Sequence, residues 1–125
     1  MRIVLTNKDE TLLYGYLDYD INIELETVLI LDLLIYKSCR GKGYGNFLIQ
    51  FLYNHIVNNH KEIKKITLVD CTSRYRKQNN IYIKLGFKYI DDKEPDMEFY
   101  MSKKLQTKKN KKLVGNPVAY IGNTI

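Results

Sequence analysis

A glycine-rich basic segment, Arg40-Gly41-Lys42-Gly43-Tyr44-Gly45, has the residue types and the spacing of an anion-binding site. Glycines at alternate positions remove the Cβ atoms that would keep a ligand away from the backbone. An apolar run precedes the segment and an amphipathic run follows it, so the pattern predicts a strand, a turn and a helix. The free N–H groups and the dipole of a helix start favour anions, and Arg40 and Lys42 add positive charge. The segment therefore predicts a site for a phosphate or a pyrophosphate.

Two familiar phosphate-binding motifs do not match this segment. The dinucleotide-binding fingerprint requires a glycine at the sixth position counted from Gly41, and Asn46 stands there. A Walker loop requires four residues between its glycines and then Lys-Ser or Lys-Thr, which the segment lacks. A glycine-rich turn that only joins a strand to a helix remains the alternative.

Asp32 is a second residue whose position suggests chemistry. It is the only charged side chain in the apolar run 27–36, and a buried carboxylate without a partner would be costly. Such a group could take a proton from an ammonium substrate, directly or through water, or attract the cation. A structural aspartate that accepts hydrogen bonds from backbone donors is an equal alternative.

The two cysteines, Cys39 and Cys71, do not indicate chemistry. Their separation matches no metal-binding pattern, and a nucleophilic cysteine would need an adjacent base. His55 and His60 fall on the predicted helix after the glycine-rich segment, with no evident route to either thiol. We therefore expect no metal and no covalent cysteine intermediate. Reduced cysteines of this kind are typical of a cytoplasmic protein.

Hydrophobic spacing predicts the elements that must position these residues. The run 27–36 is almost wholly apolar, as expected for a central strand covered on both faces. A helix separates it from the strand 65–69, so the two strands should be parallel with a right-handed crossover. The predicted strands span 2–6, 11–18, 27–36, 65–69, 87–90 and 97–103, and the predicted helices follow Gly45 and span 73–85. The predicted fold class is α/β, a mixed, mostly antiparallel sheet with helices on its faces, in the order β-β-β-α-β-α-β-β.

Length and charge narrow the class of protein. The chain has 125 residues, enough for one domain, and no apolar run reaches the about 18 residues of a membrane span. Its net charge is +6, but the first third is acidic and the remainder is basic. This division suits an enzyme that takes a cationic amine and a polyanionic cofactor. A nucleic-acid partner is not favoured, because the chain lacks the aromatic and basic pattern of a binding module.

The composition changes after Leu105. Six lysines lie between residues 103 and 112, and Gly115-Asn116-Pro117 follows them. We interpret residues 106–125 as a basic C-terminal tail or peripheral segment. A nucleic-acid-binding role for the lysines is a further hypothesis, and it predicts steeply salt-dependent binding.

Three motifs, in the correct order, resemble the GNAT superfamily of acetyl-CoA-dependent N-acetyltransferases. Arg40, Gly43 and Gly45 match the pattern Arg/Gln-x-x-Gly-x-Gly/Ala of its motif A. Tyr82-Ile83-Lys84-Leu85-Gly86-Phe87 is similar to motif B, commonly Tyr-x-Lys-x-Gly-Phe. Residues 96–105 are similar to the closing strand of the family. The resemblance covers about residues 10–105 and implies a GNAT-like acetyltransferase domain over residues 1–105.

The resemblance implies which residues bind the cosubstrate, acetyl-CoA. In the family the loop amides hold the pyrophosphate of coenzyme A. The backbone of residues 34–36 pairs with the pantetheine arm like an added strand, and one of its amides polarises the thioester carbonyl. The cofactor-binding residues implied in this way are Leu34, Ile35, Arg40, Gly41, Lys42, Gly43, Tyr44, Gly45 and Asn46.

Tyr82 and Asp32 are the predicted catalytic residues. Tyr82 matches a family general acid that protonates the departing coenzyme A thiolate, and a phenol with a pKa near 10 suits that task. Asp32 falls where polyamine acetyltransferases of the superfamily carry an acidic residue. The alternative role for Tyr82 is to pack its helix onto the sheet.

The chain departs from the family pattern in two places. The family usually begins with a strand and two helices, but only 26 residues precede the strand 27–36. We therefore expect this chain to lack the two helices that often wall the acceptor site. Tyr75 stands where the family usually carries an asparagine, about seven residues before Tyr82. Both departures affect the identity of the acceptor more than the binding of the cofactor.

We therefore expect an N-acetyltransferase that moves an acetyl group from acetyl-CoA to a primary amine by direct attack. The expected acceptor is polyamine-like or lysine-like, either a small molecule or a protein lysine. A non-catalytic acyl-CoA-binding or protein-interaction module of the same fold is the alternative. A homodimer stays open as an assembly, because a second subunit could complete the shortened N-terminal region.

Overall fold

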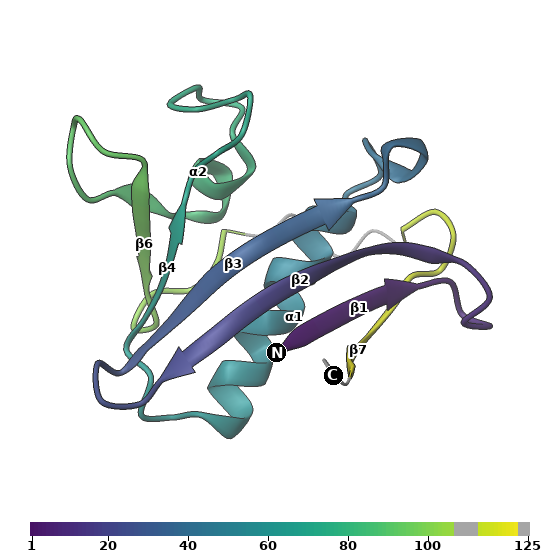
Figure 1. The fold of residues 1–125 in the computed structure, drawn as a ribbon, viewed down its shortest axis with the longest axis horizontal. Helices are drawn as coiled ribbons and strands as arrows, with labels where there is room; N and C mark the ends of the chain where they lie inside the picture. The colour runs from purple at the N-terminus through teal and green to yellow at the C-terminus, as the bar shows by residue number, and fades with distance from the viewer. Residues whose placement is uncertain (107–112, 123–125) are drawn as a thin grey trace.

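The computed structural model describes residues 1–106 and 113–122 of the chain. This part contains one seven-stranded sheet with the strand order β5-β6-β4-β3-β2-β1-β7 (Figure 1). Within it, β3 and β4 are parallel and the other neighbouring strands are antiparallel. The elements are β1 (Arg2–Thr6), β2 (Leu13–Asn22), β3 (Thr27–Ile35), η1 (Lys37–Cys39), α1 (Tyr44–Asn59), β4 (Lys65–Val69), α2 (Ile81–Leu85), β5 (Lys88–Tyr89), β6 (Asp96–Tyr100) and β7 (Val118–Gly122). The predicted fold class is confirmed.

Helix α1 lies across one face of the sheet, behind β2 and β3 in Figure 1. Its buried residues recur at helical spacing, which is why this segment folds as a helix against an apolar surface. Leu48, Leu52 and Ile56 are fully buried in one cluster with Leu17 and Val28 of the sheet. Each such burial stabilises the fold by roughly 1.5–3 kcal/mol. This packing fixes α1 to the sheet, and with it the loop at the start of the helix.

The opposite face of the sheet is open in the part of the chain that the structure describes. On β3, Val28 and Ile30 are buried, whereas Leu29 and Leu31 are 38% and 54% exposed. The prediction that the run 27–36 is covered on both faces is therefore wrong. The physical reason is that α1 and α2 pack against each other on the same side of the sheet.

The C-terminal segment contributes a strand that the sequence pattern did not predict. Strand β7 pairs antiparallel with β1, with Ile121 opposite Ile3. Residues 118–122, which we assigned from composition to a tail, are instead part of the sheet. The lysines on which that interpretation depended, Lys108, Lys109, Lys111 and Lys112, lie outside the described residues.

Helix α2 is much shorter than predicted. A helix is expected from the sequence over 73–85, but the residues before Ile81 form turns. Arg76 has a positive φ of 59°, which interrupts a helix. Asn80 caps the later start with its side chain. None of the described helices combines the length and the apolar character needed to cross a bilayer.

Candidate functional site

A β-bulge in β3 opens the sheet beside β4. Leu31 has no partner on β2, although Ile30 and Asp32 on either side of it are paired. The parallel pairing with β4 ends at the same point, where Ile30 faces Leu68, and the two strands then diverge (Figure 1). Bulges bend a strand and are common beside active sites. The edge of β3 after the bulge therefore carries backbone groups that β4 does not pair.

The backbone N–H groups at the end of β3 point to opposite edges of the strand. Tyr36 donates its N–H to the carbonyl of Tyr14, on the β2 side, at 3.0 Å. Because these directions alternate along a strand, the N–H of Leu34 also faces β2 and that of Ile35 faces the open edge. The expectation that the backbone of all three residues 34–36 pairs with a ligand is therefore wrong, because Leu34 and Tyr36 both face β2. Of the three residues, Ile35 has the amide that a ligand beside β3 could reach.

The glycine-rich segment forms the loop between η1 and α1. Gly41 and Gly43 have φ values of 79° and 83°, a left-handed conformation that glycine adopts without strain. Gly43 is the N-cap of α1, and no side chain bonds to the amides of this helix start. The first helical hydrogen bond runs from Phe47 to the Gly43 carbonyl at 3.1 Å. The N–H groups of residues 44–46 therefore have no partner within the helix and fit an anion.

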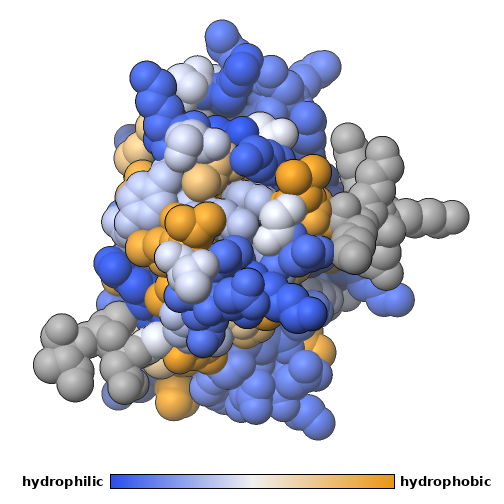
Figure 2. Space-filling model, turned by 90° about the vertical axis from the view of Figure 1, so that its right-hand side faces the viewer, coloured by the Kyte–Doolittle hydropathy of each residue, from blue (hydrophilic) through white to orange (hydrophobic). Residues whose placement is uncertain are grey.

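The surroundings of the loop are positively charged and polar. The Nε of Arg40 donates to the carbonyl of Ile35 at 2.9 Å, so the guanidinium lies beside the open edge of β3. Lys42 is exposed. On the side of the molecule seen in Figure 2, hydrophilic residues predominate and hydrophobic residues form only small groups. The two basic residues of the loop suit an anionic ligand, and charge-assisted bonds from arginine suit phosphate in particular.

Gly45 brings the loop close to α2. A Cβ at this position would lie 3.1 Å from Cδ1 of Ile81 and 3.8 Å from Cδ2 of Leu33. The glycine therefore lets α1 begin close against both α2 and β3. Since Ile81 directly precedes Tyr82, the predicted cofactor loop and the predicted acid lie at neighbouring helix starts.

Tyr82 is buried, with 7% of its surface exposed. Burial raises the pKa of Tyr82 to about 12, and the charges of Asp70 and Asp32 contribute to the rise. The phenol therefore keeps its proton at neutral pH, as a general acid must. The ring also packs edge-on against Phe87, with 5.9 Å between the ring centroids.

Asp32 lies on the open face of the sheet and is exposed. The hydroxyl of Tyr16 donates to its Oδ2 at 3.3 Å, and the guanidinium of Arg2 lies 3.8 Å from the centre of the Tyr16 ring. Arg2 in turn forms an ion pair with Asp18 at 2.7 Å. The expectation that Asp32 is buried is wrong. The carboxylate faces solvent, where it can meet a cation.

Several polar residues near Tyr82 were not predicted from the sequence. Asp70 and Asn80 are 3% and 0% exposed, and Nδ2 of Asn80 donates to Oδ2 of Asp70 at 2.8 Å. Thr72 and Tyr89 also donate to Asp70. Asparagine before a helix is a recognisable N-cap pattern, so Asn80 could have been found. Its partners belong to other elements and leave no local pattern.

The potential metal ligands of the described part form no cluster. Cys39 is half-buried, Cys71 is exposed, and both are free thiols. Across residues 1–106 and 113–122, no group of three His, Cys, Asp or Glu side chains could hold a metal ion.

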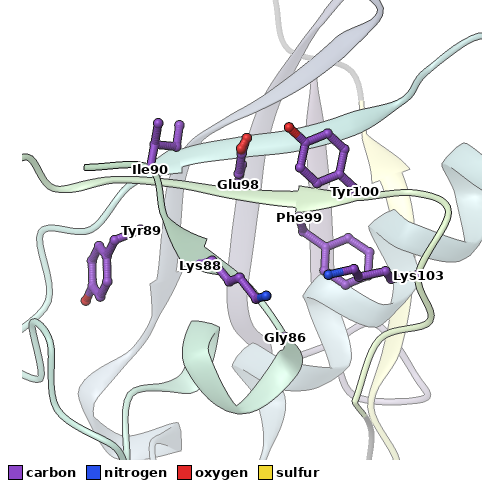
Figure 3. Close-up of a pocket in the computed structure, with 8 residues that line it drawn as sticks. All are labelled: Gly86, Lys88, Tyr89, Ile90, Glu98, Phe99, Tyr100 and Lys103. Atoms are coloured by element: carbon purple, nitrogen blue, oxygen red, sulfur yellow. The ribbon is translucent and has the colours of Figure 1, made fainter. Parts of the chain in front are cut away.

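A cavity of about 240 Å³ lies at the edge formed by β5 and β6 (Figure 3). The side chains of Lys88 and Lys103 extend toward the space beside Gly86. No predicted site residue lines this cavity, so it is separate from the predicted cofactor site. Its lining residues are Gly86, Lys88, Tyr89, Ile90, Glu98, Phe99, Tyr100 and Lys103.

The bulged edge of β3 and the free amides at the start of α1 together present backbone groups that suit an extended ligand carrying phosphate groups. Sequence comparison then gives the family. A family model described as an acetyltransferase (GNAT) domain matches residues 2–89, which is more than half of the chain. The protein belongs to this GNAT family of acetyltransferases. A search of curated protein sequences finds no significant match.

Several solved structures are similar to this one. The spermidine/spermine N-acetyltransferase SpeG of Vibrio cholerae has a TM-score of 0.62 and 18% identity, over 81% of this chain and 66% of that chain. The ribosomal-protein-S18-alanine N-acetyltransferase of Escherichia coli has a TM-score of 0.57 and 13% identity, over 73% and 63%. The PaiA N-acetyltransferase of Thermoplasma acidophilum, solved with coenzyme A, has a TM-score of 0.58 and 21% identity, over 80% of this chain and 62% of that chain. At these identities the likeness concerns the fold alone, and the chain spans less than two thirds of each relative.

Proposed function

We propose that this protein transfers an acetyl group from acetyl-CoA to a primary amine of a small polyamine-like or lysine-like acceptor. One observation carries the proposal: Gly45, at the free amides of α1, lies against Ile81, the neighbour of Tyr82. A phosphate-binding loop and a buried proton donor thus adjoin the opened edge of β3. Membership of the GNAT family supports acetyl as the group that is transferred.

The residues of this chain fit coenzyme A in two places. We assign its pyrophosphate to the N–H groups of residues 41–46, with Arg40 and Lys42 as neighbouring charges. We assign its pantetheine arm to the open edge of β3 at Ile35, beyond the bulge. The positive φ values of the loop glycines and the end of the β3–β4 pairing support these two assignments.

Bound acetyl-CoA supplies an activated thioester, and three groups of the chain act on the reaction. The N–H of Ile35 stabilises the negative charge that develops on the carbonyl oxygen as the new N–C bond forms. Tyr82 holds a proton at Oη and gives it to the leaving sulfur as the C–S bond breaks. Asp32 attracts the ammonium form of the acceptor from the open face and removes its proton, directly or through water.

Release of the coenzyme A thiol, measured with a panel of polyamines, free lysine and lysine peptides, tests this function. Tyr82→Phe should lower kcat by about 10²- to 10⁴-fold, the usual contribution of a positioned acid, and leave the Kd for acetyl-CoA unchanged. Tyr53→Phe is the matched control, because it removes a hydroxyl that bonds only the Lys103 carbonyl among the described contacts, at 3.3 Å. Unchanged turnover in Tyr82→Phe would reject the role of Tyr82.

A non-catalytic acyl-CoA-binding module is the second candidate, and the open face of the sheet favours it. No helix in the described residues walls the surface that carries Asp32. This candidate predicts that acetyl-CoA binds but that no amine of the panel releases thiol. It also predicts that the wild-type protein and Tyr82→Phe behave alike.

A further inference from the structure

Asp70, directly after β4, is a buried carboxylate with both oxygens in use. Its Oδ1 accepts from the N–H and the hydroxyl of Thr72, at 3.0 and 2.6 Å. Its Oδ2 accepts from Nδ2 of Asn80 at 2.8 Å and from the hydroxyl of Tyr89 at 2.6 Å. This one side chain therefore ties together the end of β4, the residue before α2, and β5.

The charge of this group calls for an explanation beyond packing. Burial acts to raise the pKa of Asp70, but the hydrogen bonds from Thr72, Tyr89 and Asn80 together hold that pKa below its ordinary value. The carboxylate is therefore ionised at neutral pH although it is 3% exposed. For stability alone, well-packed apolar residues often serve as well as buried charged groups. A buried anion with four donors is better suited to fixing the orientation of those donors.

Asn80 connects Asp70 to the start of α2. A side-chain amide has a donor end and an acceptor end, and a carboxylate can bond only the donor end. The Oδ1 of Asn80 must then face the other way, where it accepts from the N–H groups of Tyr82 and Ile83, at 2.8 and 3.4 Å. Helix α2 has only five residues, too few to be stable without tertiary contacts. The orientation of the Asn80 side-chain amide therefore determines where the helical turn that contains Tyr82 begins.

We propose that Asp70 is a positioning residue that orients Asn80, fixes the start of α2, and so sets the place of the Tyr82 hydroxyl beside the opened edge of β3. The inference rests on the proposed function, in which Tyr82 protonates the leaving thiolate. The proposal therefore predicts different effects on turnover and on acetyl-CoA affinity. Loss of Asp70 lowers turnover and leaves the affinity for acetyl-CoA, which depends on the loop 40–46, unchanged.

Exchanging the two partners tests this role. Asp70→Asn replaces one acceptor oxygen at position 70 with an NH₂ group. That NH₂ group must then face donors, either those of Asn80 and Tyr89 or those of Thr72. Asn80→Asp keeps acceptors for the α2 amides but sets two carboxylates face to face. The double variant Asp70→Asn/Asn80→Asp restores one hydrogen bond between the positions with donor and acceptor exchanged. Asp92→Asn, at an exposed turn residue, is the matched control for loss of a carboxylate.

Three quantities are measured for each folded variant: kcat at saturating acetyl-CoA, the Kd for acetyl-CoA by calorimetry, and amide hydrogen exchange at Tyr82 and Ile83 by NMR. In Asp70→Asn we expect kcat to fall roughly 10- to 100-fold, as for small misplacements of catalytic groups, and both amides to exchange faster. The Kd should stay within about twofold, and the double variant should regain at least about tenfold in kcat over Asp70→Asn.

Unchanged kcat and unchanged exchange in Asp70→Asn would overturn the proposal. A loss of acetyl-CoA affinity as large as the loss of kcat would also overturn it, because that pattern belongs to a general structural role. If Asp70→Asn does not fold, Tyr89→Phe replaces it. This variant keeps the ring and removes the hydrogen bond from Tyr89 to Asp70 at 2.6 Å, together with the bond that the Arg76 N–H donates to the Tyr89 hydroxyl at 2.7 Å. Normal exchange at Tyr82 in Tyr89→Phe then counts against the proposal.

The hydrogen-exchange measurement also distinguishes a failure of the proposed function from a failure of the link between Asp70 and α2. A wild-type protein that acetylates no amine would refute the proposed function. Faster exchange at Tyr82 and Ile83 in Asp70→Asn would still support the link from Asp70 through Asn80 to α2.

Discussion

The glycine-rich loop and the start of α2 lie side by side but are held in place by different means. The loop takes its shape from the backbone, through two glycines with positive φ and a helix start without a side-chain cap. The start of α2 depends on side chains at positions 70, 80 and 89, which come from separate elements. A backbone site is encoded by adjacent residues, whereas a side-chain network exists only once the sheet has formed.

This difference has a functional meaning in our account. The loop determines whether acetyl-CoA binds, and the network determines whether the bound thioester meets a correctly placed acid. Changes to the loop should therefore alter Kd, and changes to the network should alter kcat or stability. The following four predictions test this division, beginning with the largest expected effect.

Gly43→Trp should abolish measurable binding of acetyl-CoA. Gly43 has a φ of 83°, and a Cβ there would already lie 3.4 Å from Leu113, so an indole must distort the loop. Losing two amide–phosphate bonds, at about 1.5–3 kcal/mol each, weakens binding by at least about 100-fold. Calorimetric titration measures the effect. Lys61→Trp, which places the same ring on an exposed residue after α1, should bind normally, and equal losses in both variants would contradict the prediction.

Asn80→Ala should destabilise the protein by about 1.5–5 kcal/mol. The substitution removes an N-cap, worth about 0.5–2 kcal/mol, and leaves the buried Asp70 carboxylate without one donor, which costs about 1–3 kcal/mol. Urea unfolding gives the free energy of unfolding. The neighbouring Asn79 is exposed, so Asn79→Ala should change stability by less than about 0.5 kcal/mol. A similarly small change in Asn80→Ala would argue against the network.

Asp70 should make stability depend on pH in the acid range. Its pKa is lowered in the folded protein, so below the ordinary carboxyl value of about 3.9 the unfolded chain binds more protons than the folded one. The stabilisation is therefore fully present above about pH 4 and is lost as the pH falls through the lowered pKa. Unfolding free energies of the wild type and Asp70→Asn should converge over that interval. A difference that stays constant into strong acid would contradict the shifted pKa.

Gly45→Ala should have the smallest effect, and it acts on both regions at once. The added Cβ would lie 3.1 Å from Cδ1 of Ile81, the flexible end of a side chain. The crowding costs about 1 kcal/mol, and alanine offsets a similar amount through helix propensity. We expect changes of a few fold or less in both kcat and Kd. Gly45→Ala/Ile81→Val removes the crowding atom and should restore kcat; no recovery would exclude α2 as the cause.

The local sequence pattern was sufficient to predict an element where that element depends mainly on its own residues. Strands β1 and β4 have the predicted bounds, and the predicted helix after the glycine-rich turn begins at Tyr44. The parallel pairing of β3 and β4 follows from the helix between them. The loop was predicted for the same reason, since its glycines, its basic residues and the helix start are adjacent in the sequence.

Features that depend on distant segments could not be predicted in this way. The apolar character of β3 indicates a strand, but it does not say which elements cover its two faces. Tyr14 bonds the carbonyl of Gly115 at 3.1 Å across 101 positions, and β7 joins β1 over a similar separation. Asp70 and Tyr89 meet only because β4 and β5 both pair with β6.

The most direct test of this account compares Gly43→Trp and Tyr82→Phe in the same pair of assays, acetyl-CoA affinity by calorimetry and amine-dependent thiol release. We predict that Gly43→Trp loses affinity, and that Tyr82→Phe keeps wild-type affinity but loses turnover. Equal effects of the two variants on both quantities would contradict the division between a binding loop and a catalytic α2. A wild-type protein that does not bind acetyl-CoA would contradict the proposed function itself.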